Sequence, residues 1–388
     1  MKIVIVNSFF PPWRGGAESY TFNLATSLHA RGHDVVVFCG DAPLPAGTEV
    51  VNGVRVERLK ITRKIYGTPV MPSLLRSLSG EPADILHANF PSPYIAFQTA
   101  NAAKKKMATS VITWHNDLPP VTSAAGLLVE VHDRLVLPYY LRHFSRIIAT
   151  TEAYANSSRN LRRFRDKVVV IPNGVDTIRF NTRVSGEDIK QKFGLTDCRV
   201  LLFVGALTKW HRYKGLDILL SAMPLLKRLG RSVRLLVVGG GSLEEEYRIL
   251  ARSLGVSEET IFAGDVSDDT LPEYYACADV VVVPSKDRSE GFGLTILEAN
   301  ATGKPVIGSD VGGIPNVIND GMNGKLVRPN DPLMLAETIT ELLSSDGLMD
   351  KLGRAGRVLA EHYDWSIVAE RTEKLYESVR STQESGRL

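Results

Sequence analysis

Short apolar runs alternate with longer amphipathic segments along almost the whole chain. Runs such as residues 2–7, 34–39 and 279–284 are apolar throughout their interiors instead of alternating with polar residues. This pattern is typical of parallel strands that are covered on both faces. The segments between them, such as residues 17–31 and 243–254, have helical periodicity. Alternating strands and helices predict an α/β fold with doubly wound parallel sheets.

The alternation runs through two successive series, which predicts two Rossmann-like domains. A chain of 388 residues is long enough for two domains of ordinary size. Pro172, Asn173 and Gly174 interrupt the pattern, so we expect an N-terminal domain over residues 1–176 and a C-terminal domain over residues 177–364. No strand follows the helix expected over residues 365–380, which we expect to pack back onto the first domain. Two such sheets facing each other predict a ligand cleft at the carboxyl ends of their strands.

Composition excludes several classes of protein. The formal net charge of +3 is too small for the whole chain to be a nucleic-acid binder. The chain begins with a strand-like run without a signal core, and no apolar stretch approaches the ~20 residues of a membrane-spanning helix. Cys39, Cys198 and Cys277 are odd in number and far apart, which argues against a disulfide framework or zinc site and favours the cytoplasm.

The most informative segment is residues 289–299, which follows a predicted strand and leads into a helix. Gly291 and Gly293 let the backbone approach a ligand closely. The amides from Gly293 through Leu294 and Thr295 are unpaired donors at a helix N-terminus, which is a ready phosphate site. Glu290 then lies in the loop, and Glu298 lies about one turn into the helix. A carboxylate there can accept a hydrogen bond from each of two ribose hydroxyls. Two solvated glutamates on a capped helix are the alternative.

A second segment adds positive charge. Lys209, Arg212 and Lys214 lie in the loop between a predicted strand over residues 199–205 and the next helix. Cations beside a helix N-terminus suit a diphosphate whose charge grows as it leaves. A solvated basic loop explains them equally well.

In the first domain, Gly15 and Gly16 lie between the first strand and the first helix, and His115 ends another strand. The dinucleotide fingerprint G-x-G-x-x-G is absent, and a lone histidine at such a position is more often structural than functional. The sequence also contains no phosphate-loop motif, no H-E-x-x-H pair and no D-x-D pair. We therefore expect no metal, and we expect cations and helix dipoles to handle phosphate charge.

Together these motifs resemble family 4 of the retaining, nucleotide-sugar-dependent glycosyltransferases, which have the two-Rossmann GT-B architecture. The resemblance covers nearly the whole chain and includes the Gly15-Gly16 loop. It also includes the IPNGVD passage at residues 171–176, the YKGLD stretch at residues 213–217 and the paired glycines within residues 308–315. Its most specific part is Glu290, seven residues and Glu298 in EGFGLTILEA.

The resemblance implies a role for each candidate residue. Glu298 holds the donor ribose, and Glu290 contacts the transferred sugar and assists the reacting centre. Lys214 binds the diphosphate, Gly15 and Gly16 lie against it, and His115 contacts the donor sugar. The backbone that contacts the sugar and diphosphate belongs to Gly291, Phe292, Gly293, Leu294 and Thr295.

One position departs from the family pattern. Many members have an arginine after the glycine that ends the first strand of the second domain, but this chain has Ala206 there. We expect Arg212 to supply the second cation, with Lys209 as the alternative.

The expected activity is metal-independent retaining transfer of a sugar from a UDP- or GDP-sugar to a hydroxyl of a glycan, lipid or lipid-linked acceptor in cell-envelope glycan biosynthesis. No cofactor and no nucleic-acid partner are expected. Two other classes stay open. One is a related GT-B enzyme such as a sugar-nucleotide epimerase, and the other is a non-catalytic peripheral membrane-binding protein.

A membrane contact is suggested by residues 124–144, which read as a long helical stretch that Pro138 kinks or ends. Apolar side chains share a broad face of it, and arginines and Lys167 make up a basic stretch from Arg142 to Lys167. Lys104, Lys105 and Lys106 lie in the same domain. This combination suits loose docking of a cytoplasmic enzyme to the cytoplasmic face of an anionic membrane. The alternative is that the apolar face packs on the sheet and the arginines are solvated.

Overall fold

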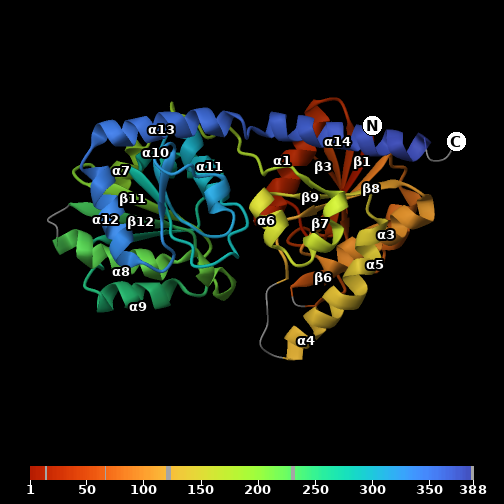
Figure 1. The fold of residues 1–388 in the computed structure, drawn as a ribbon, viewed down its shortest axis with the longest axis horizontal. Coiled ribbons are helices and arrows are strands. Elements are labelled where there is room, and N and C mark those ends of the chain that lie inside the picture. The colour runs from red at the N-terminus through yellow and green to blue at the C-terminus, as the bar shows by residue number, and fades with distance from the viewer. Residues whose placement is uncertain (14, 66, 119–123, 229–231, 386–388) are drawn as a thin grey trace. The chain divides into compact units, whose positions relative to one another are not determined.

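The structure is a computed structural model that describes residues 1–13, 15–65, 67–118, 124–228 and 232–385. The chain divides into two compact units. Unit 1 consists of Met1–Gly174 with Trp365–Leu388, and unit 2 consists of Val175–Asp364. In each unit, helices pack on a mainly parallel sheet (Figure 1).

Unit 1 is built on an eight-stranded sheet of order β10-β9-β8-β7-β1-β2-β4-β3. Every neighbouring pair is parallel except β3 and β4, which form an antiparallel hairpin. The strands are β1 (Lys2–Val6), β2 (Asp34–Gly40), β3 (Gly47–Val51), β4 (Val54–Leu59), β7 (Ile85–Phe90), β8 (Thr109–Trp114), β9 (Arg146–Ala149) and β10 (Val168–Val170). A separate ribbon pairs β5 (Arg63–Ile65) with β6 (Thr68–Val70).

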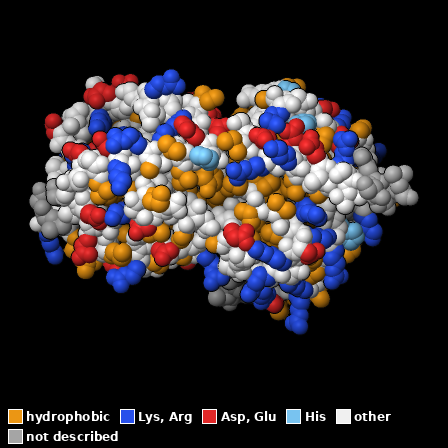
Figure 2. Space-filling view, turned by 45° about the horizontal axis from the view of Figure 1, so that its top comes forward, with side chains coloured by type: hydrophobic (Ala, Val, Ile, Leu, Met, Phe, Trp, Pro, Cys, Tyr) orange, Lys and Arg blue, Asp and Glu red, His pale blue; other side chains and the backbone are white. Residues whose placement is uncertain are grey.

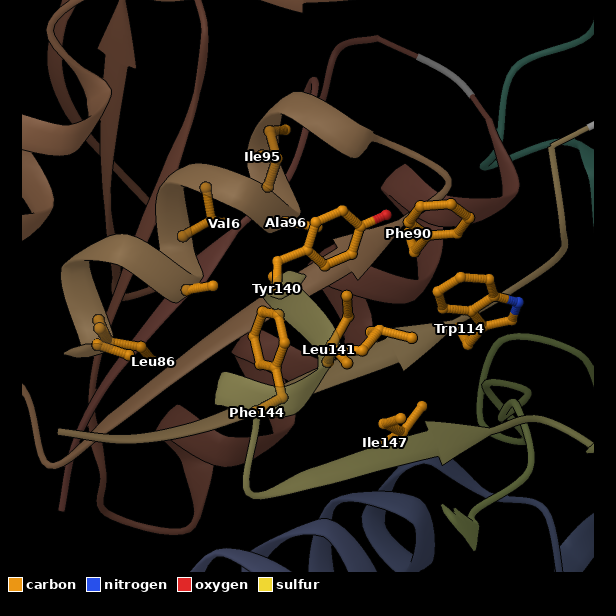
Figure 3. Close-up of a cluster of buried hydrophobic side chains, with 14 of the residues drawn as sticks. Val6, Leu86, Phe90, Ile95, Ala96, Trp114, Tyr140, Leu141, Phe144 and Ile147 are labelled. Carbon is orange, nitrogen blue, oxygen red and sulfur yellow. The ribbon is translucent and has the colours of Figure 1, made fainter. Parts of the chain in front are cut away.

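Helices cover both faces of this sheet, which explains why its strands are apolar throughout. Val4 and Val6 belong to one buried cluster, whereas Ile3 and Ile5 belong to another. Figure 3 shows the first cluster, in which side chains of α5 lie against those of α3 and the strands. The helices of unit 1 are α1 (Gly16–Ala30), α2 (Leu74–Gly80), α3 (Pro93–Lys106), α4 (Ala124–Val131), α5 (Leu137–His143), α6 (Glu152–Ser157), the 3₁₀ helix η2 (Leu161–Lys167) and α14 (Trp365–Ser385).

The last helix, α14, covers the second cluster together with α1. Trp365, Val368 and Tyr376 are buried in that cluster. Gly174 lies under the Trp365 ring, since a Cβ there would come within 2.6 Å of Trp365 Cδ2. The glycine of the IPNGVD passage therefore makes room for the indole that begins α14.

The stretch over residues 124–143 is helical, as the sequence predicts, and its hydrogen bonding becomes irregular directly before Pro138. The helix changes register in a π-helical turn, η1 (His132–Val136), and continues as α5. Pro138 is the second residue of α5 and directly follows the π-helical turn, so of the two outcomes expected for it, a kink or an end, the end of the helix is wrong. Among the described residues, none of the helices is long and apolar enough to cross a bilayer.

Unit 2 has a six-stranded, wholly parallel sheet of order β13-β12-β11-β14-β15-β16, covered on both faces. The strands are β11 (Arg199–Val204), β12 (Val233–Val238), β13 (Thr260–Gly264), β14 (Val280–Val283), β15 (Val306–Ser309) and β16 (Gly324–Val327). The helices are α7 (Glu187–Phe193), η3 (Lys209–Lys214), α8 (Leu216–Arg228), α9 (Glu244–Ser253), α10 (Leu271–Cys277), α11 (Leu294–Ala301), η4 (Ile314–Asn316), α12 (Pro332–Leu343) and α13 (Asp346–Glu361).

Candidate active site

The glutamate segment of unit 2 forms the connection from β14 to α11. Gly293 precedes α11 with a φ of 88°, which favours glycine. Gly313 N donates a 2.8 Å hydrogen bond to Glu290 O. A Cβ on Gly312 would lie 2.3 Å from Glu290 O, and one on Gly313 would lie 2.1 Å from Gly291 O. The paired glycines within residues 308–315 are therefore required for the close packing that fixes the Glu290 turn.

Buried Glu290 and partly buried Lys214 form an ion pair. Lys214 Nζ lies 3.1 Å from Glu290 Oε2, and Ser285 Oγ donates to the same oxygen at 3.3 Å. Burial opposes the charge of Lys214, but the Glu290 carboxylate outweighs burial and raises the pKa of Lys214. The structure thus brings together two of the predicted residues as a fixed pair of opposite charges.

The YKGLD stretch holds this pair in place. Lys286 N donates to Tyr213 O at 2.7 Å, and Lys286 Nζ lies 2.9 Å from Asp217 Oδ2. A Cβ on Gly215 would lie 1.9 Å from Pro284 O. The stretch after β11 is therefore clamped to the stretch after β14, which carries Lys214 to Glu290.

Glu298 lies on α11 and has a partner that sequence reasoning missed. Tyr275 OH, on α10, donates to Glu298 Oε2 at 2.5 Å. Burial raises the pKa of Glu298, against the opposing effect of the Tyr275 hydrogen bond and the charges of Arg179 and Lys214. The bond to Tyr275 engages one carboxylate oxygen of Glu298.

The first turn of α11 contains Leu294 and Thr295, both half-buried. Gly293 precedes them without a side-chain cap. First-turn amides of a helix lack intrahelical partners and carry the positive end of its dipole. Gly291, Phe292 and these amides thus belong to the same connection as Glu290.

Arg212 lies on η3 but faces another partner. Its guanidinium is half-exposed and forms a 2.5 Å ion pair with Glu246 Oε2 of α9. The charge of Lys209 also acts on Glu246. In this structure Arg212 is bound to α9, whereas Lys214 is bound to Glu290.

In unit 1, Gly15 and Gly16 lie at the start of α1. A Cβ on Gly15 would lie 2.2 Å from Glu18 Oε2, whereas one on Gly16 would meet nothing within 4 Å. Burial raises the pKa of Glu18 to about 7. Gly15 therefore leaves room for a buried carboxyl group that sequence reasoning gave no role.

His115 follows β8 and is held by neighbours on β7 and α1. Its Nε2 lies 3.1 Å from Asn89 Oδ1, and its ring meets the Tyr20 ring edge-on at a centroid distance of 4.7 Å. Asn89 Nδ2 donates to Val6 O and to Thr21 Oγ1, so Asn89 Oδ1 is the acceptor for His115. Burial lowers the pKa of His115 to about 4. At neutral pH, His115 therefore donates through Nε2 and keeps the Nδ1 lone pair as an acceptor.

The described residues contain no group of three histidines, cysteines, aspartates or glutamates that could hold a metal ion.

Comparisons with known proteins match both units. A family model described as "Glycosyl transferases group 1" matches residues 185–359, and one described as "Glycosyltransferase Family 4" matches residues 14–179. An uncharacterized glycosyltransferase of Methanocaldococcus jannaschii is 29% identical over 97% of this chain and 98% of its own. A GDP-mannose-dependent alpha-(1-6)-phosphatidylinositol monomannoside mannosyltransferase of Mycolicibacterium smegmatis is 28% identical over 99% of this chain and 100% of its own.

The crystal structure of Anabaena HepE in complex with UDP and glucose superposes with a TM-score of 0.79 at 20% identity. The match covers 97% of this chain and 100% of that one. The likeness confirms the α/β fold of the GT-B type that the sequence predicts.

Proposed function

Because the chain belongs to the group 1, family 4 glycosyltransferases, a retaining family, we propose that its donor is a nucleoside diphosphate sugar. We propose that its acceptor is a hydroxyl group. The observation that carries the proposal is the Lys214–Glu290 ion pair, in which Glu290 is buried and precedes the N-terminus of α11. A fixed cation beside unpaired amides suits a diphosphate. In this proposal unit 2 is the donor domain and unit 1 the acceptor domain.

Each donor group has a proposed partner in unit 2. Glu298 accepts hydrogen bonds from the ribose hydroxyls, with Tyr275 fixing its carboxylate. Lys214 and the amides of Leu294 and Thr295 bind the diphosphate, and Glu290 with the backbone of residues 291–293 contacts the transferred sugar. From unit 1, the Gly15-Gly16 loop contacts the diphosphate, and Nδ1 of His115 accepts a hydrogen bond from a sugar hydroxyl.

The proposed reaction breaks the bond from the sugar C1 to the β-phosphate oxygen. The acceptor oxygen forms its new bond to C1 on the same face, and its proton passes to the departing phosphate. Negative charge grows on the diphosphate as it leaves, and Lys214 stabilises it together with the α11 dipole. Arg212 is the proposed second cation, which requires it to leave Glu246. We propose that neither a metal nor a cofactor takes part.

The substrates are proposed from the named relatives. The mycobacterial relative is named for GDP-mannose and a phosphatidylinositol mannoside, and the Anabaena structure contains UDP and glucose. We propose a UDP- or GDP-sugar as donor and a glycan, lipid or lipid-linked acceptor of the cell envelope. Buried Cys39 and Cys277 are free thiols, which suits work in the cytoplasm, with loose association at its membrane face.

A panel of nucleotide sugars tests the proposal. Incubation of the full chain with UDP- and GDP-sugars should release nucleoside diphosphate from one donor class, and this release should persist in EDTA. The Lys214→Ala variant is the matched negative, because the proposal gives it the largest loss of turnover. Loss of activity in EDTA would overturn the metal-free mechanism. Conversion of the donor into an isomeric nucleotide sugar, without diphosphate release, would instead point to an epimerase.

A further inference from the structure

The helical segment over residues 124–143 changes its surroundings at the π-helical turn η1. On α5, Leu137, Tyr140 and Leu141 are fully buried against the sheet and α3 (Figure 3). On α4 and η1, by contrast, Leu127 is 69% exposed and Leu135 is 67% exposed. The exposed stripe consists of Leu127, Leu128, Val131, Leu135 and Val136. The alternative in which this apolar face packs on the sheet is therefore wrong for these five residues.

The exposed stripe is held in a defined orientation. Asp133 of η1 is buried and accepts from Asn160 Nδ2 at 3.0 Å, and His132 Nδ1 lies 2.8 Å from its other oxygen. Arg159 of the adjoining loop pairs with Glu130 of α4 at 2.7 Å. Figure 1 shows α4 extending from α5 away from the sheet of unit 1. The stripe is thus a fixed feature of a projecting helix.

Exposed cations lie on η1, on α5 and on the elements that contact them. Arg134 lies on η1 itself, and Lys104 Nζ lies 6.0 Å from the ring centroid of Tyr139 on α5. Arg163 of η2 donates to Asp133 O, which places η2 beside η1. We define the cationic rim as Lys104, Lys105, Arg134, Arg142 and Arg162, all of which are exposed. Figure 2 shows Lys and Arg side chains mixed with hydrophobic ones at the lower end of unit 1. Within the described part of the chain, no rim residue has an acidic side chain as an ion-pair partner.

Charge complementarity favours an anionic membrane over a second copy of the chain as the partner of this surface. A second copy would bring one cationic rim against another across a two-fold axis, because both copies present the same patch. Like charges facing each other oppose such a dimer. An anionic bilayer offers hydrocarbon to the exposed stripe and negative headgroups to the rim at once.

We propose that the exposed stripe and the cationic rim form a docking surface for an anionic phospholipid bilayer. This docking proposal rests on the proposed function only in taking the acceptor to be a lipid or to be lipid-linked. Docking orients unit 1 at the membrane surface, where such an acceptor lies. It needs no catalysis, so it is measured separately from turnover.

Cosedimentation of the full chain with vesicles tests the surface. The protein should bind phosphatidylglycerol–phosphatidylcholine vesicles at low salt, and it should bind pure phosphatidylcholine vesicles far less. Raising the salt should release it, since exposed charges are screened. The double variant Leu127→Glu/Leu135→Glu should lower binding by about tenfold or more, and so should Arg134→Glu/Arg142→Glu.

Matched controls lie on exposed positions of unit 2. Leu333→Glu on α12 and Arg354→Glu on α13 introduce the same types of substitution at exposed residues that do not belong to the stripe or the rim. Both variants should bind vesicles as the wild type does. All variants should release nucleoside diphosphate with a water-soluble acceptor.

Docking is overturned if the wild type does not bind anionic vesicles at low salt, or if the stripe variant binds as the wild type does. A dimer in ultracentrifugation that Leu127→Glu/Leu135→Glu abolishes, without vesicle binding, would instead identify a second copy as the occupant. Vesicle binding without diphosphate release from any donor would overturn the proposed function alone.

Discussion

Lys214 of unit 2 and His115 of unit 1 handle charge in opposite ways. In unit 2, Lys214 remains charged although it is partly buried, because Glu290 lies 3.1 Å away and raises its pKa. In unit 1, burial lowers the pKa of His115 to about 4 and raises that of Glu18 to about 7. The first arrangement preserves a fixed charge, and the second favours neutral groups.

The difference indicates what each unit can contribute to a transfer reaction. A fixed cation stabilises charge that grows in a transition state without reorganising. A neutral imidazole, held by Asn89, orients a hydroxyl without adding charge. We therefore expect substitutions in unit 2 to have the larger effects on turnover.

Removal of the Lys214 charge tests the strongest part of the comparison. Lys214→Ala should lower kcat by about 10²–10³-fold, with a smaller change in donor KM, because the charge that Lys214 meets grows as the bond breaks. Steady-state diphosphate release measures both constants. Lys227→Ala, which breaks an ion pair with Glu259, is the control and should retain activity. An effect on KM alone would contradict the assigned role.

Loss of Glu298 should act mainly on donor binding. Glu298→Ala should cost about 1.5–3 kcal/mol of donor affinity, since the ribose hydroxyls lose a charged acceptor. Tyr275→Phe should give a smaller loss, because it removes only the hydrogen bond that orients the carboxylate. Calorimetric titration with the nucleoside diphosphate measures both. Tyr274→Phe on the same helix is the matched control, and unchanged affinity in Glu298→Ala would exclude Glu298 from the site.

The neutral state of His115 predicts a pH dependence of stability. Its folded pKa of about 4 lies below the ordinary value of 6.5, so the unfolded chain binds the proton more readily between these values. Stability should therefore fall as the pH falls from 6.5 towards 4. Thermal unfolding of wild type and His115→Gln across that range should show a weaker dependence in the variant. Identical slopes would mean that His115 is not desolvated.

The fold was predictable because both faces of each sheet are buried. Successive residues such as Ile3 and Val4 enter different clusters, so strands had to be apolar throughout. The antiparallel strand β3 was missed although its signal is present. Asn52 and Gly53 have φ values of 48° and 82°, and an Asn-Gly pair between two strand-like runs is the standard hairpin turn.

The partners of the site residues were harder to predict than the residues themselves. Lys214 and Glu290 are 76 positions apart and meet because β11 and β14 are neighbouring parallel strands. Strand order is not encoded in any local pattern, so Tyr275 could not be assigned to Glu298. Helical periodicity likewise indicated the apolar face containing Leu127 and Leu135 but not whether the core covers it.

The smallest expected effect on kcat concerns Arg212, whose charge is exposed, unlike that of Lys214. Arg212 replaces the family arginine in the proposal, yet its guanidinium is half-exposed and paired with Glu246. If Arg212 turns to the diphosphate when the donor binds, Arg212→Ala should lower kcat by less than Lys214→Ala, and Lys209→Ala should be nearly silent. The stability of Arg212→Ala should stay close to wild type, because exposed ion pairs contribute little. Glu246→Gln frees Arg212 and should leave kcat equal to or above wild type. Diphosphate release at saturating donor ranks the four variants, and a larger loss in Lys209→Ala than in Arg212→Ala would transfer the role to Lys209.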